Sequence, residues 1–151
     1  MQMLQTAPEA WDISPAAIES TRSCLKALGD SAPANLICRD IMAIDDACCA
    51  RYDSIVISEV LEHCENPRRM LCKVSALTVP GGIIYINVPV NSPSIDHIYL
   101  FKNPEEVAAL VEQVGLEIEQ FVCAPAAGYD EALARKRETT ISCAVMARKV
   151  A

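Results

Sequence analysis

The hydrophobic and polar positions of this chain follow two alternating patterns. Short apolar runs are separated by longer segments whose apolar residues recur at helical spacing. The short runs predict a strand that ends near residue 13 and strands over 35–38, 54–58, 83–88, 116–123 and 140–147. Strands that alternate with helices are typical of an α/β fold, in which helices cover both faces of a mainly parallel sheet. We expect the run 54–58 to be buried on both faces, because its centre is continuously apolar.

Three helices are predicted from one recurring signal, a capping side chain followed by proline. The signal occurs at Ser14-Pro15, Asn66-Pro67 and Asn103-Pro104. Gly29 and Gly115 are expected to end the first and third helices, and the second is expected to reach about residue 77. The sequence Pro-Gly-Gly at 80–82 then predicts a turn into the strand 83–88.

Composition places the chain among globular proteins and argues against two classes of partner. The 151 residues, of which 52% are hydrophobic and 22% charged, suit a single domain over residues 1–151. The net charge of −7 argues against a nucleic-acid surface, and we interpret the basic cluster 135–137 as a solvated helix end. No run of about 18 apolar residues could span a bilayer. Because the N-terminus also lacks the order of a secretory signal, we expect a cytoplasmic protein with no membrane partner.

The eight cysteines are interpreted as reduced thiols, mostly in the core. None of them forms a Cys-x-x-Cys pair, and several fall on apolar faces. A metal site built from Cys48, Cys49, Cys64 and His63 is the alternative. We expect no metal there, because adjacent cysteines seldom ligate one ion.

The segment 52–82 carries the most specific pattern in the chain. Asp53 comes directly before the strand 54–58, the run Ser-Glu-Val-Leu-Glu-His at 58–63 leaves it, and the Pro-Gly-Gly turn begins the next strand. In order and spacing these features resemble class I S-adenosylmethionine-dependent methyltransferases, over about residues 12–149. The resemblance implies a Rossmann-like methyltransferase sheet that is closed by an antiparallel strand pair, and it implies S-adenosylmethionine as the cofactor.

The resemblance assigns cofactor contacts to residues at the carboxyl ends of the predicted strands, where open α/β sheets bind ligands. Asp12 matches the acidic residue that accepts hydrogen bonds from both ribose hydroxyls, and a carboxylate suits a vicinal diol because it has two acceptor oxygens. Asp40 and Ile41 match the residues that read the adenine amino group and pack on the ring. Ser58 and Glu59 match the lining of the methionine part and the methyl-transfer channel. The alternatives are a helix-start residue for Asp12 and a loop residue for Asp40.

The two histidines are the candidate catalytic residues. His63 follows Glu59 by four residues, a spacing that could put both on one helix face. By resemblance it contacts substrate or serves as a general base, for which the near-neutral pKa of histidine is suitable. A packing or capping role is an open alternative. His97, in the loop after the strand 83–88, matches a histidine over the substrate pocket in the family.

One part of the family pattern is missing. No glycine precedes Gly29, so the first strand and the glycine-rich cofactor loop of the family are not in this chain. The strand ending near residue 13 would then lack its neighbour and expose an apolar seam. We therefore expect a homodimer, or a partner subunit that supplies the missing strand and loop. The predicted function is methyl transfer to a small-molecule acceptor, and the alternative is a non-catalytic interaction or regulatory subunit.

Overall fold

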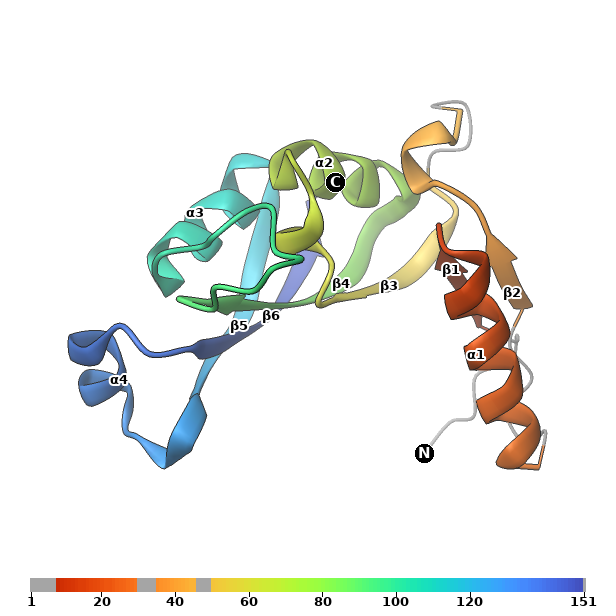
Figure 1. Ribbon diagram of the computed structural model, residues 1–151. Coiled ribbons are helices and arrows are strands. Elements are labelled where there is room, and N and C mark those ends of the chain that lie inside the picture. The colour runs from red at the N-terminus through yellow and green to blue at the C-terminus, as the bar shows by residue number, and fades with distance from the viewer. Residues whose placement is uncertain (1–7, 30–34, 46–49, 151) are drawn as a thin grey trace. The chain divides into compact units, whose positions relative to one another are not determined.

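The computed structural model describes residues 8–29, 35–45 and 50–150. The chain forms two compact units, Met1–Asp45 and Asp46–Ala151 (Figure 1). Cys48 and Cys49 lie outside the described residues, so the structure does not test the metal site considered for them. In the described part of the chain, no helix is long and apolar enough to cross a bilayer.

The first unit is a small strand–helix–strand arrangement. It contains β1 (Glu9–Asp12), α1 (Pro15–Ala27), β2 (Asn35–Cys38) and the 3-10 turn η1 (Ile41–Ala43). The two strands are parallel, with Asp12 paired to Cys38, and the N–H of Arg39 donates to the carbonyl of Asp12 at 2.9 Å. Both strands therefore end at the same edge, as the sequence pattern predicted.

The second unit is built on a mixed four-stranded sheet in the order β3-β4-β6-β5. Strands β3 and β4 are parallel, and β6 is antiparallel to both β4 and β5, which confirms the predicted closing pair. The elements are β3 (Tyr52–Ser58), η3 (Leu61–His63), α2 (Pro67–Leu77), β4 (Thr78–Val90), α3 (Pro104–Gln113), β5 (Leu116–Pro125), η4 (Ala126–Gly128), α4 (Glu131–Arg137) and β6 (Ile141–Lys149).

The three predicted helix starts are confirmed. Ser14, Asn66 and Asn103 each accept a hydrogen bond from the backbone N–H three residues later, at 3.3, 2.9 and 2.9 Å. Proline follows each of them at the first helical position, where its missing N–H costs nothing. The basic cluster 135–137 forms the exposed last turn of α4, as expected.

The core of the second unit lies between one face of the sheet and two helices. Helices α2 and α3 lie over the same side of the sheet (Figure 1). The side chains at that face are fully buried, and they include Ile84, Ile86 and Val88 of β4, Cys143 and Val145 of β6, Leu71 of α2, and Val107 and Val111 of α3. Burial of every second residue of β4 and β6 is the pattern of strands with one covered face.

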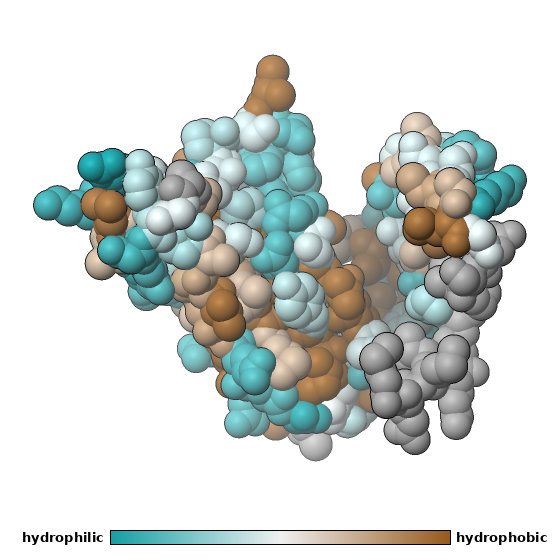
Figure 2. Space-filling view, turned by 90° about the horizontal axis from the view of Figure 1, so that it is seen from below, coloured by the Kyte–Doolittle hydropathy of each residue, from teal (hydrophilic) through white to brown (hydrophobic). Residues whose placement is uncertain are grey.

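The opposite face of this sheet carries exposed apolar side chains. Val56 is paired with Tyr85, and their exposed fractions are 72% and 39%. Val122 of β5 is 57% exposed. Figure 2 shows the molecule from below, and hydrophobic residues cluster on the surface of this unit. The expectation that the run 54–58 is buried on both faces is therefore wrong, because α2 and α3 cover the other face only.

The Pro-Gly-Gly segment is part of β4 and not a separate turn. Tyr52 pairs with Thr78 and Ser54 pairs with Ile83, so the strand bulges between these two pairs. A Cβ atom at Gly82 would lie 2.6 Å from Thr78 Cγ2 and 2.9 Å from the carbonyl oxygen of Asp53. Glycine is required there because the bulge brings the two strands too close for any side chain.

The cysteine prediction is only partly right. The described cysteines are free thiols, and Cys143 is fully buried in the core. Cys24, Cys38 and Cys72 are exposed, in contrast to the expected core placement.

Candidate functional site

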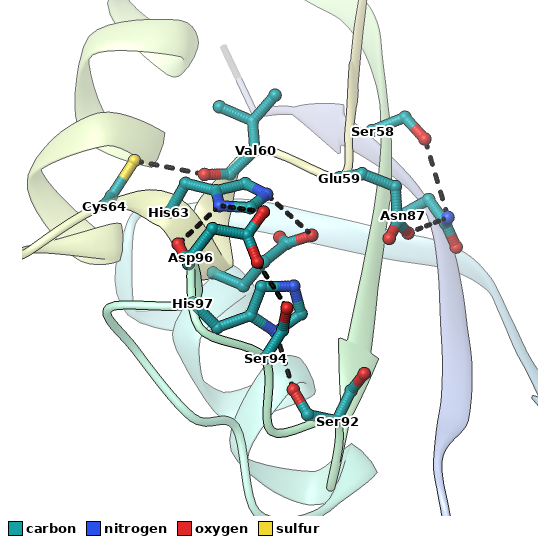
Figure 3. Close-up of polar contacts among 11 residues, drawn as sticks. Ser58, Glu59, Val60, His63, Cys64, Asn87, Ser92, Ser94, Asp96 and His97 are labelled. Carbon is teal, nitrogen blue, oxygen red and sulfur yellow. Dashed lines mark hydrogen bonds and ion pairs between the residues drawn. The ribbon is translucent and has the colours of Figure 1, made fainter.

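The carboxyl edge of the parallel pair β3 and β4 brings together the residues of the Ser-Glu-Val-Leu-Glu-His run. Ser58 is the last residue of β3 and pairs with Asn87 of β4. The N–H of Glu59 donates to the carbonyl of Asn87 at 3.0 Å, and Asn87 Nδ2 donates to Glu59 Oε1 at 2.7 Å (Figure 3). Ser142 Oγ donates to Asn87 Oδ1 at 2.8 Å. Asn87 therefore fixes the position of the Glu59 carboxylate.

Glu59 adopts a backbone conformation that is uncommon for a residue with a Cβ atom. Its φ is +52°, and Asn91, directly after β4, has a φ of +49°. Left-handed residues of this kind cost conformational energy and are frequent at functional sites. Both parallel strands thus end in a sharp change of direction at the same edge. Ser58 and Glu59 are both exposed there, so a ligand can reach them.

The expectation that Glu59 and His63 share a helix face is wrong. Glu59 lies in the strand exit, and His63 ends η3, a 3-10 turn of only three residues. In η3 the side chains of Leu61 and Glu62 are each 1% exposed. Because the chain leaves β3 through a left-handed residue, it is Glu62 and not Glu59 that points into the protein beside His63.

Glu62 is a buried carboxylate whose two oxygens have no hydrogen-bond partner among the described residues. Its Oε1 lies 3.9 Å from His63 Nε2, which is longer than a hydrogen bond. Burial raises the pKa of the Glu62 carboxyl, and the nearby charge of Glu59 acts in the same direction. The backbone amide of Glu62 itself lowers this pKa, and His63 and His97 act in the same direction as that amide.

The loop after β4 brings His97 to Glu62 and His63. The N–H groups of Ile98 and Tyr99 both donate to the backbone carbonyl of Glu62 at 2.9 Å, which anchors the loop to η3. The two imidazole rings are 5.0 Å apart between centroids and nearly perpendicular, at 83°. The two predicted catalytic residues thus lie in one cluster with Glu62.

The remaining predicted cofactor residues lie in the first unit, at the carboxyl edge of β1 and β2. Asp12 Oδ1 accepts a hydrogen bond from the N–H of Ser14 at 2.7 Å, and Asp40 Oδ1 accepts one from the N–H of Met42 at 2.8 Å. The local structural roles considered for both aspartates are therefore real. Each carboxylate also has a second oxygen that a ligand can use. Ile41 follows at the start of η1, half-buried.

The sequence did not predict the local roles of two residues of this region. Glu62 is part of the quoted run, and its position next to a histidine was the available signal. Asn87 lies 28 residues after Glu59, and only the parallel pairing of β3 and β4 brings the two together.

A cavity of about 480 Å³ begins at Asn91, directly after β4. It is lined by Asn91, Leu100, Lys102, Asn103, Pro104, Arg135, Glu138 and Ile141. None of the predicted site residues lines it. We therefore base the candidate site on the strand ends and not on this cavity.

Comparison with known proteins identifies the family. A family model described as a methyltransferase domain matches residues 9–84, which is about half of the chain. The matched region runs from β1 into β4 and includes both strand exits with acidic residues. The chain belongs to the methyltransferase-domain family. A comparison with curated protein sequences gave no match.

Solved structures share this fold at low sequence identity. The cyclase SpnF is 15% identical with a TM-score of 0.73, over 94% of this chain. A methyltransferase structure from Methanosarcina mazei is 13% identical with a TM-score of 0.67, over 94% of this chain. The 1,6-didemethyltoxoflavin-N1-methyltransferase of Burkholderia thailandensis, solved with bound 1,6-didemethyltoxoflavin and S-adenosylhomocysteine, is 18% identical with a TM-score of 0.65, over 95% of this chain. This chain spans 65%, 81% and 61% of those three chains, respectively.

Proposed function

We propose that the protein takes part in S-adenosylmethionine-dependent methyl transfer to a small-molecule acceptor. The observation that carries this proposal is the strand exit after β3, where Asn87 holds the exposed Glu59 carboxylate at the carboxyl edge of the sheet. Family membership supports the reaction type. The Burkholderia structure with bound S-adenosylhomocysteine supports the cofactor.

The acidic residues at the strand ends suit the polar parts of this cofactor. Asp12 would accept hydrogen bonds from the ribose hydroxyls, and Asp40 would accept one from the adenine amino group beside Ile41. Ser58 and Glu59 would hold the methionine part, where a carboxylate matches the cofactor's ammonium group. The bound cofactor supplies an activated methyl group on a sulfonium. The chain would contribute mainly alignment of the acceptor, with His63 and His97 at the acceptor side.

We propose that a homodimer or a partner subunit completes this site. Strand β3 is at the edge of its sheet, and edge strands readily pair with a further strand. The family pattern leads us to expect a parallel strand followed by a glycine-rich loop, and no segment before Gly29 matches it. A strand that pairs with β3 would place that loop at the carboxyl edge, next to Ser58 and Glu59.

A second candidate function is a non-catalytic interaction role. It is favoured by the exposed apolar face of the second unit, where Val56, Tyr85 and Val122 lie. Apolar surface of this kind is typical of sites that contact other proteins. The two functions differ in one respect that can be measured, because only the first requires the cofactor to bind.

Calorimetric titration of the full chain with S-adenosylmethionine tests the proposal. We expect Asp12→Asn to weaken binding by about 1.5–3 kcal/mol, or about 12- to 140-fold, through loss of a charged acceptor. Asparagine can still accept the N–H of Ser14, so the local turn is kept. Asp130→Asn, a change at the start of α4, is the matched control and should leave binding unchanged. Absence of binding both by the chain alone and after co-expression with its partner would favour the interaction role.

A further inference from the structure

The chain has only two histidines, and both lie in the cluster with the buried Glu62. The three side chains come from η3 and from the loop after β4, which are more than 30 residues apart in sequence. The oxygen of Glu62 and the ring nitrogens of His63 and His97 all lie within 4.8 Å of one another. A carboxylate and two imidazoles form a common ligand set for transition metals.

The buried carboxylate of Glu62 lacks the partners that such a group requires. A charged or polar group removed from water is costly unless it is hydrogen-bonded, paired or bound to a metal. Glu62 is 1% exposed, and neither of its oxygens has a hydrogen-bond partner among the described residues. The imidazole of His63 is too distant, at 3.9 Å, to satisfy it directly. A cation between these groups would supply the missing interaction.

The imidazoles are oriented so that one nitrogen of each is available to a metal. His63 Nδ1 lies 2.8 Å from the backbone oxygen of Asp96, and His97 Nδ1 lies 2.6 Å from that of Ser92 (Figure 3). A carbonyl oxygen only accepts hydrogen bonds, so both Nδ1 atoms carry the proton. In the neutral rings both Nε2 atoms then keep a free lone pair. In metal-binding histidines, the ring nitrogen that does not bind the metal usually donates to a carbonyl or a carboxylate.

The ligand atoms lie 3.9 Å apart for Glu62 Oε1 and His63 Nε2 and within 4.8 Å for the other pairs, so they would have to move closer together around a cation. Ligand bonds of about 2.0–2.2 Å put neighbouring ligands of a tetrahedral ion about 3.4 Å apart. The present 3.9 Å between Glu62 Oε1 and His63 Nε2 is half an ångström longer. The His63 side chain is 37% exposed, so the cluster opens toward solvent on that side. Three protein ligands and an open side leave a coordination position for water or another oxygen donor.

We propose that Glu62, His63 and His97 bind one divalent transition-metal cation of the Mn²⁺ to Zn²⁺ series. Two nitrogen ligands favour these ions over Mg²⁺ and Ca²⁺, which prefer oxygen ligands. The site is at the carboxyl edge of β3 and β4, so its open position faces the region where the acceptor is expected. A hydroxyl group bound there would lose its proton more easily, since a bound cation lowers the pKa of such ligands. Cation binding itself does not depend on the proposed methyl transfer.

Titration of the full chain with Co²⁺, followed by visible absorption, tests the proposal. We expect one bound Co²⁺ with d–d bands and without the intense thiolate charge-transfer bands that cysteine ligands produce. Glu62→Gln, His63→Gln and His97→Gln should each raise the Kd at least about 10-fold. The matched control Glu65→Gln changes an exposed carboxylate near the cluster and should leave the Kd unchanged.

Three results would overturn the proposal: no Co²⁺ binding, thiolate bands in the Co²⁺ spectrum, or an unchanged Kd in all three cluster variants. Because Glu62 is in the core, circular dichroism must first show that its variant folds. His63 and His97 are at least partly exposed, so their variants decide the question if Glu62→Gln does not fold. Mg²⁺ at equal concentration should not displace Co²⁺, and displacement would overturn the assignment to the transition-metal series.

Discussion

Replacing Glu62 with methionine should stabilise the protein in the absence of metal. The substitution keeps a flexible side chain of similar length and removes two buried oxygens that have no hydrogen-bond partner. A buried polar group without a partner costs about 1–3 kcal/mol, so the free energy of unfolding should rise by up to this amount. Glu65→Met, at an exposed position, is the matched control and should change stability by less than about 0.5 kcal/mol.

Saturation with the cation should make the unsubstituted protein more stable than Glu62→Met. A ligand at 100 times its Kd adds about 2.7 kcal/mol to the free energy of unfolding of the protein that binds it. For a chain of this size that corresponds to a rise in Tm of about 5–11 °C. Glu62→Met lacks one of the three ligands and should gain little.

Thermal unfolding of both proteins, with chelator and with excess Co²⁺, measures these changes. The structure predicts a more stable variant in chelator and a selective rise in the Tm of the unsubstituted protein with Co²⁺. A variant that is destabilised by several kcal/mol in chelator would mean that Glu62 has stabilising partners in solution. An equal rise in the Tm of both proteins would show that the cation binds at another site.

Further predictions concern the fold and its cysteines. Gly82→Ala should lower the free energy of unfolding by about 1–3 kcal/mol, because its Cβ would meet a backbone oxygen at 2.9 Å; an unchanged urea midpoint would contradict the bulge geometry. In the same assay, Ile86→Ala should lower the free energy of unfolding by about 2–5 kcal/mol, because Ile86 is fully buried. Val56→Ala should lower it by less than about 0.5 kcal/mol unless a partner covers the exposed face of the sheet. Burial raises the pKa of Cys143 from 9.0 to about 12, with the neighbouring Cys123 acting in the same direction. The native protein should therefore be alkylated at Cys72 long before Cys143, as mass spectrometry can show. The raised pKa of Cys143 should also lower the free energy of unfolding as the pH rises from 9.0 toward 12, because the thiol loses its proton first in the unfolded chain.

Local signals predicted much of the fold. Ser14, Asn66 and Asn103 cap their helices through contacts only three residues away, so the sequence alone contains the necessary information. The closing antiparallel pair followed from the family resemblance, and the structure confirms it. The exposure of Val56 did not follow, because the burial of a strand face depends on which helices pack there.

The candidate site was predicted less completely, for a related reason. The strand exit at Ser58 and Glu59 was found from its motif. The role of Asn87 depends on pairing between strands 28 residues apart, which no local pattern encodes. The burial of Glu62 was unexpected, since glutamate is rarely buried, and it results from the left-handed turn at Glu59. The two histidines were singled out separately, and the loop anchored to Glu62 brought them together.

Mapping the binding of S-adenosylhomocysteine by NMR on the full chain, with its partner if one is required, tests the proposed methyl-transfer function most directly. We expect the largest amide shift changes at Asp12, Asp40, Ser58 and Glu59, which are the four polar positions at the strand ends. Shift changes confined to the cavity lined by Lys102 and Arg135, or none at all, would contradict the proposed cofactor site.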